Sequence, residues 1–412
     1  MTTWNDDDKH HSRTVDRTLP DPRDVIVDTD WAALHHAYGP AEDTPSSLLR
    51  LLDDSPEVQA EALGALDMSV LHQGSLYSAT PPAALFIAGI LSDPRTTARH
   101  ESFYPWDDRT RALRAALLEF LGQVADAAAY GETDGDDHAR KVQDDADTDV
   151  TACRAIRPAL YAAVSAFIDD PDPDVREAAV GAAGALLKAP NLADQVPDAV
   201  RHFRRVLATR TDRRERAAAV LSISVCHQDT ADLLTDEDPA IRACAALSPA
   251  NAGNGEATEI LLRALLEPAV ADAWFPEPLP QFDGWFRFTL LAAAIERTES
   301  FDALLPAALA LLTMADEYTV DNDWGPLLAK AFPHGFTSAM ALTASQRDFL
   351  EAVVGKDDCW GNIANRDRWL HGAGLPHRRA ELRAILGRVP SDGAQGVGTG
   401  SDDGCHSRLS SP

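Results

Sequence analysis

The chain is 412 residues long and carries 37 lysine and arginine residues against 65 aspartate and glutamate residues, a formal net charge of -28. A surface this acidic repels both the phosphates of nucleic acids and an anionic membrane, so we expect neither as a partner. No apolar run approaches the ~20 residues of a membrane-spanning helix, and the first residues lack the apolar core of a secretion signal. Five dispersed cysteines without a Cys-x-x-Cys pair favour reduced thiols in the cytoplasm over disulfides or a zinc site.

Both ends of the chain differ in composition from the rest. Residues 1–28 are charged and almost free of large apolar side chains, and residues 389–412 are rich in glycine, serine and aspartate. Such segments bury too little apolar surface to fold, so we expect two disordered tails. Between them, apolar residues recur at helical spacing throughout residues 29–388, which predicts one all-α domain.

The predicted helices begin near Trp31. Trp31, Leu34 and Tyr38 have helical spacing, and Gly39-Pro40 ends that helix. A pair of helices over residues 44–71 forms the first complete repeat. Further helices are expected over residues 81–91, 107–130, 155–168, 173–188, 197–209, 212–226, 256–266, 304–315, 325–332, 343–354, 360–370 and 376–386.

Residues 131–150 interrupt these helices with a run of carboxylates that face only Arg140 and Lys141. The composition predicts a flexible acidic insert between repeats. A calcium site is the alternative, because three oxygen donors lie close together at Asp134, Asp136 and Asp137. The segment lacks the alternating ligands, the glycine and the final glutamate of an EF-hand loop, so we expect no metal.

The segment Asp170–Lys188 carries the clearest helix start. Asp172 can cap the helix, because its carboxylate accepts from backbone N–H groups of the first turn, and Pro173 suits the first helical position. The same seven-residue opening recurs at residues 53–59 and 236–242, each followed by an alanine-rich run. A capped helix that recurs along an all-helical chain predicts a solenoid, in which each helical pair buries its apolar face against its neighbours.

These openings resemble the HEAT repeat, the two-helix unit of the armadillo/HEAT superfamily. Asp170 and Arg176, like Asp236 and Arg242, stand six residues apart as in that repeat. The resemblance implies a right-handed α-α superhelix in which these structural pairs link a repeat internally or to its neighbour. Gln59 replaces the arginine in the first copy, so that repeat either lacks the link or makes a neutral one.

A dense basic cluster stands out against the acidic background. Seven arginines lie within residues 201–216. One interpretation is that they pair with carboxylates of adjacent repeats, including the 131–150 insert. The other is a receptor site for an acidic or phosphorylated segment, since the guanidinium fork suits carboxylates and phosphates. The candidate anion-binding residues are Arg201, Arg204, Arg205 and Arg213.

Large aromatic residues gather in three turns between predicted helices, above all in the loop over residues 269–286. Pro276, Pro278 and Pro280 prevent a regular helix there and favour an extended conformation. Rigid aromatic side chains are common at protein interfaces, but they can equally clamp helices or cover the core as a lid. The candidate protein-binding residues are Trp106, Trp274, Phe275, Phe282, Trp285, Phe286 and Trp324.

No catalytic constellation stands out. The sequence has no Gly-x-Ser-x-Gly, no phosphate-binding glycine loop and no His-x-x-x-His. The stretch Trp31–Pro45, together with Asn365, Trp369 and Leu375-Pro-His377, also looks like bacterial HEAT-repeat proteins without an assigned activity. The superfamily contains bilin lyases and alkylpurine DNA glycosylases too, but no bilin motif is visible and the negative charge opposes DNA binding.

We therefore expect a non-enzymatic, cofactor-free scaffold that binds another protein, with an immunity-like protein that sequesters a basic partner as one form. The first alternative is a regulatory receptor that holds an acidic or phosphorylated segment through the 201–216 arginines. The second is a lyase or DNA glycosylase of the HEAT-like type.

Overall fold

The computed structural model describes residues 18–102, 109–130, 144–282, 284–337, 341–361 and 364–387. This part of the chain is mostly helical, as the sequence predicted. Contacts divide the chain into two compact units, Met1–Met314 and Ala315–Pro412, where the sequence indicated one domain over residues 29–388. Among the described residues, no helix combines the length and the apolar composition needed to cross a bilayer.

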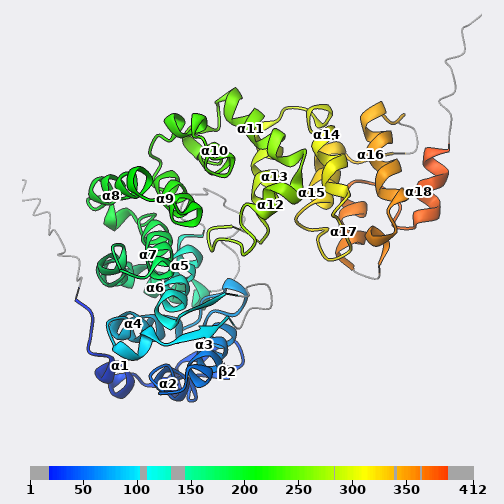
Figure 1. Ribbon diagram of the computed structural model, residues 1–412. Coiled ribbons are helices and arrows are strands. Elements are labelled where there is room, and N and C mark those ends of the chain that lie inside the picture. Colours follow the sequence, from blue (N-terminus) through cyan, green and yellow to red (C-terminus); the bar gives the residue numbers. More distant parts are fainter. Residues whose placement is uncertain are drawn as a thin grey trace, which may run out of the picture. The chain divides into compact units, whose positions relative to one another are not determined.

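The first unit contains fourteen helices and two short hairpins within its described residues (Figure 1). The helices are α1 (Pro22–Asp28), α2 (Thr44–Arg50), α3 (Pro56–Val70), α4 (Thr80–Ile90), α5 (Leu113–Ala129), α6 (Asp144–Val164), α7 (Pro173–Leu186), α8 (Val196–Thr209), α9 (Arg213–Val225), α10 (Pro239–Ala246), α11 (Gly255–Leu265), α12 (Pro268–Ala273), α13 (Phe286–Arg297) and α14 (Phe301–Leu312). The hairpin strands are β1 (His35–His36) with β2 (Gly39–Pro40), and β3 (Arg99–Glu101) with β4 (Thr110–Ala112).

The folded part begins earlier than the sequence indicated. Residues 22–28, assigned to a disordered tail, form helix α1. Asp21 caps it by accepting from the N–H of Arg23 at 2.8 Å, and Val25 is buried. α1 lies against α4, where a Cβ at Gly89 would come within 2.7 Å of the Pro22 ring. The missing side chain at Gly89 therefore makes room for the helix that composition alone assigned to the tail.

The helix predicted from Trp31 to Tyr38 is wrong. Those residues form a 3-10 turn, η1 (Trp31–Ala33), followed by the β1–β2 hairpin. The backbone of His35 is engaged by the α3–α4 connection, because its N–H donates to Ser78 Oγ and its C=O accepts from the N–H of Ala79. These long-range bonds replace the local bonds of a helix.

The acidic insert is also shorter than expected, since α6 begins at Asp144; residues 131–143 lie outside the described part of the chain. The three recurrent openings, in contrast, start helices as predicted. Ser55, Asp172 and Asp238 cap α3, α7 and α10 through their side chains, and each is followed by proline at the first helical position.

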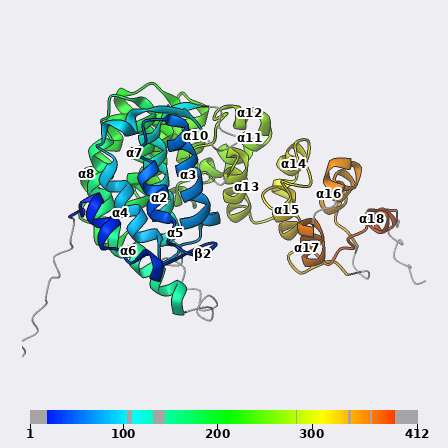
Figure 2. The same cartoon turned by 90° about the horizontal axis from the view of Figure 1, so that it is seen from below.

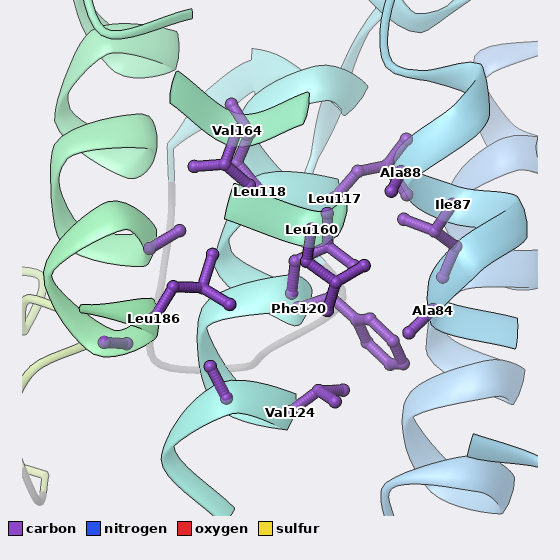
Figure 3. Packing of buried hydrophobic residues seen from close by; sticks show 14 of the residues in the cluster. Ala84, Ile87, Ala88, Leu117, Leu118, Phe120, Val124, Leu160, Val164 and Leu186 are labelled. Atoms are coloured by element: carbon purple, nitrogen blue, oxygen red, sulfur yellow. The ribbon is translucent and has the colours of Figure 1, made fainter. Parts of the chain in front are cut away.

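The helices of the first unit pack in two layers. α2, α4 and α6 form one layer, and α3, α5, α7 and α9 form the other. Across the layers α2 packs on α3, α4 on α5, and α6 on both α5 and α7, while α9 packs on α8. Figure 2 gives the same helices in a second view. Figure 3 shows Ile87 of α4, Phe120 of α5 and Leu160 of α6 pointing into one shared core, where all three are buried.

Two glycines set the spacing within the second layer. A Cβ at Gly122 of α5 would come within 3.1 Å of the backbone of Ala182 in α7, and one at Gly184 of α7 would come within 2.5 Å of Ser222 Oγ in α9. Ser222 in turn donates to the carbonyl of Val180 at 2.9 Å. The helices thus approach at backbone distance.

The aspartate and arginine six residues apart link neighbouring helical pairs. Arg176 of α7 donates to the carbonyl of Asp170 at 2.8 Å, which holds the turn before its own helix. The remaining N–H groups of Arg176 reach forward to Glu215 of α9, at 3.0 and 2.6 Å. The carboxylate of Asp170 reaches backward to Arg114 of α5, at 3.4 Å.

The same pattern repeats in the other two openings. Arg242 donates to the carbonyl of Asp236, whose carboxylate pairs with Arg216 of α9 at 2.6 Å. In the first opening, Gln59 donates to the carbonyl of Asp53 at 2.9 Å. Of the two alternatives for Gln59, the structure therefore has the neutral link.

The second unit contains α15 (Trp324–Ala331), α16 (Ala344–Gly355), α17 (Ala364–Gly372) and α18 (Arg379–Leu386) among its described residues. α15 packs on α17, and α16 packs on α18. Trp324 is fully buried at the start of α15, where Asp323 caps the helix. Trp369 of α17 donates to Asp321 at 2.7 Å, which ties α17 to the turn before α15.

Candidate functional site

Each arginine of the 201–216 cluster has a carboxylate within 4.0 Å inside the chain. Arg201 pairs with Asp198 on its own helix, Arg204 with Asp232 at 2.7 Å, and Arg205 with Asp169 at 3.1 Å. The other four pairs are Arg210–Glu215 at 3.8 Å, Arg213–Asp238 at 2.8 Å, Arg214–Glu177 at 2.7 Å and Arg216–Asp236 at 2.6 Å. The cluster is therefore neutralised by neighbouring turns and helices.

The pairs differ in burial. The side chains of Arg201 and Arg205 are 71% and 58% exposed, and such surface pairs stabilise a protein little. The side chain of Arg214 is only 17% exposed, and two of its N–H groups donate to the carboxylate of Glu177 in α7, at 2.8 and 2.7 Å. The sequence singled out this segment, and its members divide into a surface group and a buried group.

A buried charge network surrounds Glu177. The guanidinium of Arg111 in β4 donates to both carboxylate oxygens of Glu119 in α5, and the guanidinium of Arg109 lies 3.8 Å from the carboxylate of Glu177. Burial raises the pKa of Glu177, and the guanidiniums of Arg214 and Arg109 oppose that rise. Sequence reasoning missed Glu119 and Glu177. The only sequence signal was a glutamate inside an otherwise apolar helix stripe.

The connection between α12 and α13, residues 274–285, belongs to the first unit and packs against other helices of that unit. Its ends are held by a buried pair, in which Arg287 donates from its backbone to Asp272 at 3.0 Å and from its guanidinium to the same carboxylate. Phe275, Phe282 and Phe286 then form an aromatic cluster with ring centroids 4.6 to 5.3 Å apart. This cluster gives the loop its own small core.

The middle of the same loop, residues 276–281, contacts α7 and α9. Arg214 of α9 donates to the carbonyl of Glu277. The side chain of Gln281 packs on Gly181 of α7, where a Cβ would come within 2.5 Å of its amide nitrogen. Both polar atoms of that amide are buried, and neither has a hydrogen-bond partner among the described residues.

The aromatic candidates therefore have different environments. Phe275, Phe282 and Phe286 are buried within the loop, and Trp324 is buried in the second unit, so these four hold structure together in this arrangement. Trp285 is 36% exposed and Trp274 is half-buried, so these two are the candidates within the described residues that present surface to a partner. Trp106 lies outside the described residues.

Three exposed glutamates lie along α11 and at the start of α12, with the exposed Arg263 between them, and this stretch is called the α11–α12 face below. Glu256, Glu259 and Glu267 are exposed, and among the described residues none of the three has an ion-pair partner. Two apolar side chains lie in the same stretch, Leu266 and Val270, each 49% exposed. Carboxylates around exposed apolar groups suit a basic segment with an apolar residue of its own.

Two cavities of about 20 Å³ border the buried network. One is lined by Arg111, Glu119 and His100, whose Nε2 is buried without a hydrogen-bond partner among the described residues. A volume of this size has room for about one water molecule, which is too small for a ligand. The second lies between α5, α7 and Gln281.

A wider cleft of about 480 Å³ opens at the C-terminal ends of α5, α7 and α9. It is lined by apolar side chains with Lys188, which pairs with Asp126 at 2.7 Å, and by Cys226. Burial raises the pKa of the Cys226 thiol to about 11. That thiol stays protonated at neutral pH and is a poor nucleophile there.

Histidines that are far apart in sequence meet at one place. Tyr38 Oη lies 3.5 Å from His72 Nδ1, and its ring packs edge-on against both His72 and His36. His36 Nε2 lies 2.9 Å from Asp43. Within the described residues, no three His, Cys, Asp or Glu side chains are grouped so that they could hold a metal ion.

Comparison with models of protein families and with curated protein sequences found no match to this chain. The arrangement of its own residues is therefore the basis for a proposal about function.

Proposed function

We propose that the chain is a HEAT-like α-solenoid that acts as a non-enzymatic scaffold and holds a basic segment of another protein. The recurrent capped helices, the six-residue link and the paired stacking of α2 to α9 support the solenoid. The buried thiols of Cys153, Cys226, Cys244 and Cys359 support a reducing, cytoplasmic location.

One observation supports the basic partner above the alternatives. All seven arginines of the 201–216 cluster have intramolecular carboxylates, whereas the carboxylates on the α11–α12 face have none among the described residues. The net charge of the α11–α12 face is therefore negative, with three glutamates against the exposed Arg263 of α11. An acidic or phosphorylated ligand would have to replace existing partners of the arginines, whereas a basic ligand meets unpaired carboxylates.

The test uses the whole chain and two synthetic peptides of equal length, one basic with a central leucine and one with phosphoserine and glutamate. We expect the basic peptide to bind, with an affinity that falls as salt is raised. Glu256→Gln, Glu259→Gln and Glu267→Gln together should weaken it about tenfold, because each removes one favourable charge. Arg204→Ala with Arg205→Ala should leave it unchanged.

The reverse pattern favours the receptor alternative. Tight binding of the phosphorylated peptide, lost in the Arg204→Ala/Arg205→Ala variant, would show that the guanidiniums exchange their internal carboxylates for the ligand. All variants are compared only where they still unfold in one cooperative transition.

A further inference from the structure

The cleft at the C-terminal ends of α5, α7 and α9 has the size and the lining of a small-molecule site. Its volume is about 480 Å³, within the range of ~300–1,000 Å³ that is usual for such sites. The buried members of its lining are Leu187, Ala189 and Cys226, and Ala129 and Val196 add further apolar surface. An apolar molecule bound there would remove its own surface and that of the cleft from water.

The backbone at His227, on the exposed part of the lining, is strained. Its φ is 54°, in the left-handed region that residues other than glycine rarely adopt. The residue lies just beyond the end of α9, where glycine commonly ends a helix, and its N–H donates to the carbonyl of Ser224 at 3.0 Å. Strained residues of this kind cluster at functional sites, so the strain singles out this cleft independently of its volume.

The charges around the cleft favour a cation over an anion. The three helices bring the negative ends of their dipoles to it. The two basic side chains beside it already have acceptors: Arg154 donates to the carbonyls of Ala128 and Tyr130, at 2.8 and 3.0 Å, and Lys188 pairs with Asp126 at 2.7 Å. The ends of α7 and α9, which have no basic residue in their last turns, and the net charge of -28 then give the cleft a negative potential.

Two groups at the end of α5 can bind an ammonium group. The side chain of Asp126 is 41% exposed, and Tyr130, four residues later, is 85% exposed. Both line the cleft. The face of a tyrosine ring attracts a cation within ~6 Å of its centre, and a carboxylate attracts the same cation directly.

We infer that this cleft binds a small organic cation, whose apolar body packs on Leu187, Ala189 and Cys226 and whose ammonium group lies between Asp126 and Tyr130. The ligand's ammonium takes the place of Lys188 on Asp126. Lys188 has a flexible stem and an exposed side chain, so its own ammonium group can turn to solvent. The inference goes beyond the proposed function, because it assigns a small-molecule site on another surface.

The test compares three probes that share the indole ring and differ in charge at neutral pH. Tryptamine is a cation, tryptophol is neutral and indoleacetate is an anion. Ligand-observed NMR titration of the whole chain measures the three dissociation constants. We expect tryptamine to bind about fivefold more tightly than tryptophol, and indoleacetate to bind most weakly. Absence of tryptamine binding would overturn the inference, and so would an equal or reversed order of the three affinities.

A cleft-filling variant locates the site. Ala193 is exposed and lines the cleft, so Ala193→Trp should weaken tryptamine binding about tenfold or more by occupying the same space. Ala208→Trp is the matched control, because Ala208 is an exposed alanine of α8 that does not line the cleft. Binding that is unchanged in an Ala193→Trp chain that melts cooperatively would overturn the inference.

Two charge variants decide the question if Ala193→Trp does not melt cooperatively. Lys188→Met leaves Asp126 available and should tighten tryptamine binding about threefold, whereas Asp126→Asn leaves Lys188 unpaired and should weaken it about threefold. Shifts in the same direction, or no shift in either variant, would overturn the inference. Because these titrations use no peptide and no residue of the α11–α12 face, their failure is distinguishable from failure of the basic-segment proposal.

Discussion

Glu215 of α9 is 5% exposed and is paired with Arg176, which donates two N–H groups to it from the preceding helical pair. Arg210 is its only other cationic neighbour among the described residues, at 3.8 Å. A buried ion pair adds little net stability, but removal of one partner leaves an uncompensated charge. Replacement of one member of the pair should therefore lower the free energy of unfolding much more than replacement of both.

Arg176→Met should lower the free energy of unfolding by about 3 kcal/mol, because Glu215 loses its forked partner inside the protein. The double variant Arg176→Met/Glu215→Leu should regain most of that loss. Denaturant unfolding of the three chains measures the cycle. A double variant no more stable than the single one would show that backbone contacts of Arg176, and not its charge, hold the two helices.

His100 should make the stability of the folded chain depend on pH, in a direction that its burial determines. Burial lowers its pKa below the ordinary value of 6.5, so the unfolded chain binds the proton more readily than the folded chain. The stability that this difference supplies is complete above pH 6.5 and is lost as the pH falls through the folded-state pKa. His100→Gln should therefore destabilise less at acidic pH than at neutral pH.

The measurement is the difference in free energy of unfolding between His100→Gln and the unsubstituted chain across that range. His72→Gln serves as the control, because His72 is partly exposed and its ring has few polar contacts. A difference that stays constant with pH for His100 would show that the imidazole is equally protonated in both states.

At the scale of helices, close approach depends on glycine. Gly184→Ala should lower the free energy of unfolding by about 2 kcal/mol, because its Cβ would press on the Ser222 backbone and force α7 and α9 apart. Gly255→Ala is the matched control, since a Cβ there meets no atom within 4 Å. Equal stability of the two variants would mean that the α7–α9 spacing is adjustable.

Gln59 tests the neutral version of the repeat link. It is 1% exposed and donates to the carbonyls of Asp53 and Arg95. Gln59→Met keeps the volume but leaves both carbonyls without that donor, so we expect a loss of about 1 to 2 kcal/mol in thermal or denaturant unfolding. A smaller loss would indicate that water reaches the turn.

The helix openings could be predicted because their signals are local. A capping side chain followed by proline acts within one turn, and it gave the correct start for α3, α7 and α10. The β1–β2 hairpin could not be predicted from its own residues, because the bonds that select it come from Ser78 and Ala79, far along the chain.

The candidate binding surfaces, like the helices, could be predicted only as far as their signals are local in the sequence. The density of arginines in residues 201–216 was visible in the sequence, but their partners, such as Asp169, Asp232 and Glu177, are 25 or more positions away and only the fold identifies them. The contact of Gln281 with Gly181 spans 100 positions and carries no local signal. Residue spacing in the sequence predicted the helices, whereas tertiary packing determines which side chains remain available to a partner.

For the whole molecule, excess negative charge is the dominant long-range term. The formal charge of -28 opposes compaction by mutual repulsion of exposed carboxylates. An increase from about 0.1 M to about 1 M NaCl shortens the screening length from ~10 Å to ~3 Å, so the melting temperature should rise. The rise should shrink near pH 4.7, where the net charge vanishes. A melting temperature that falls with salt would show that exposed ion pairs outweigh the repulsion.

The links through Arg114, Arg176 and Arg216 also fix the order of the helical pairs. Each arginine meets a carboxylate that only the following pair supplies: Asp170, Glu215 and Asp236, respectively. The aspartate that accepts from Arg114 and from Arg216 belongs to the recurrent opening, so those two junctions have the same kind of acceptor. The junction through Arg176 depends on Glu215 instead, so insertion or deletion of a pair at that point would leave a guanidinium without its acceptor unless a glutamate is supplied at the same place.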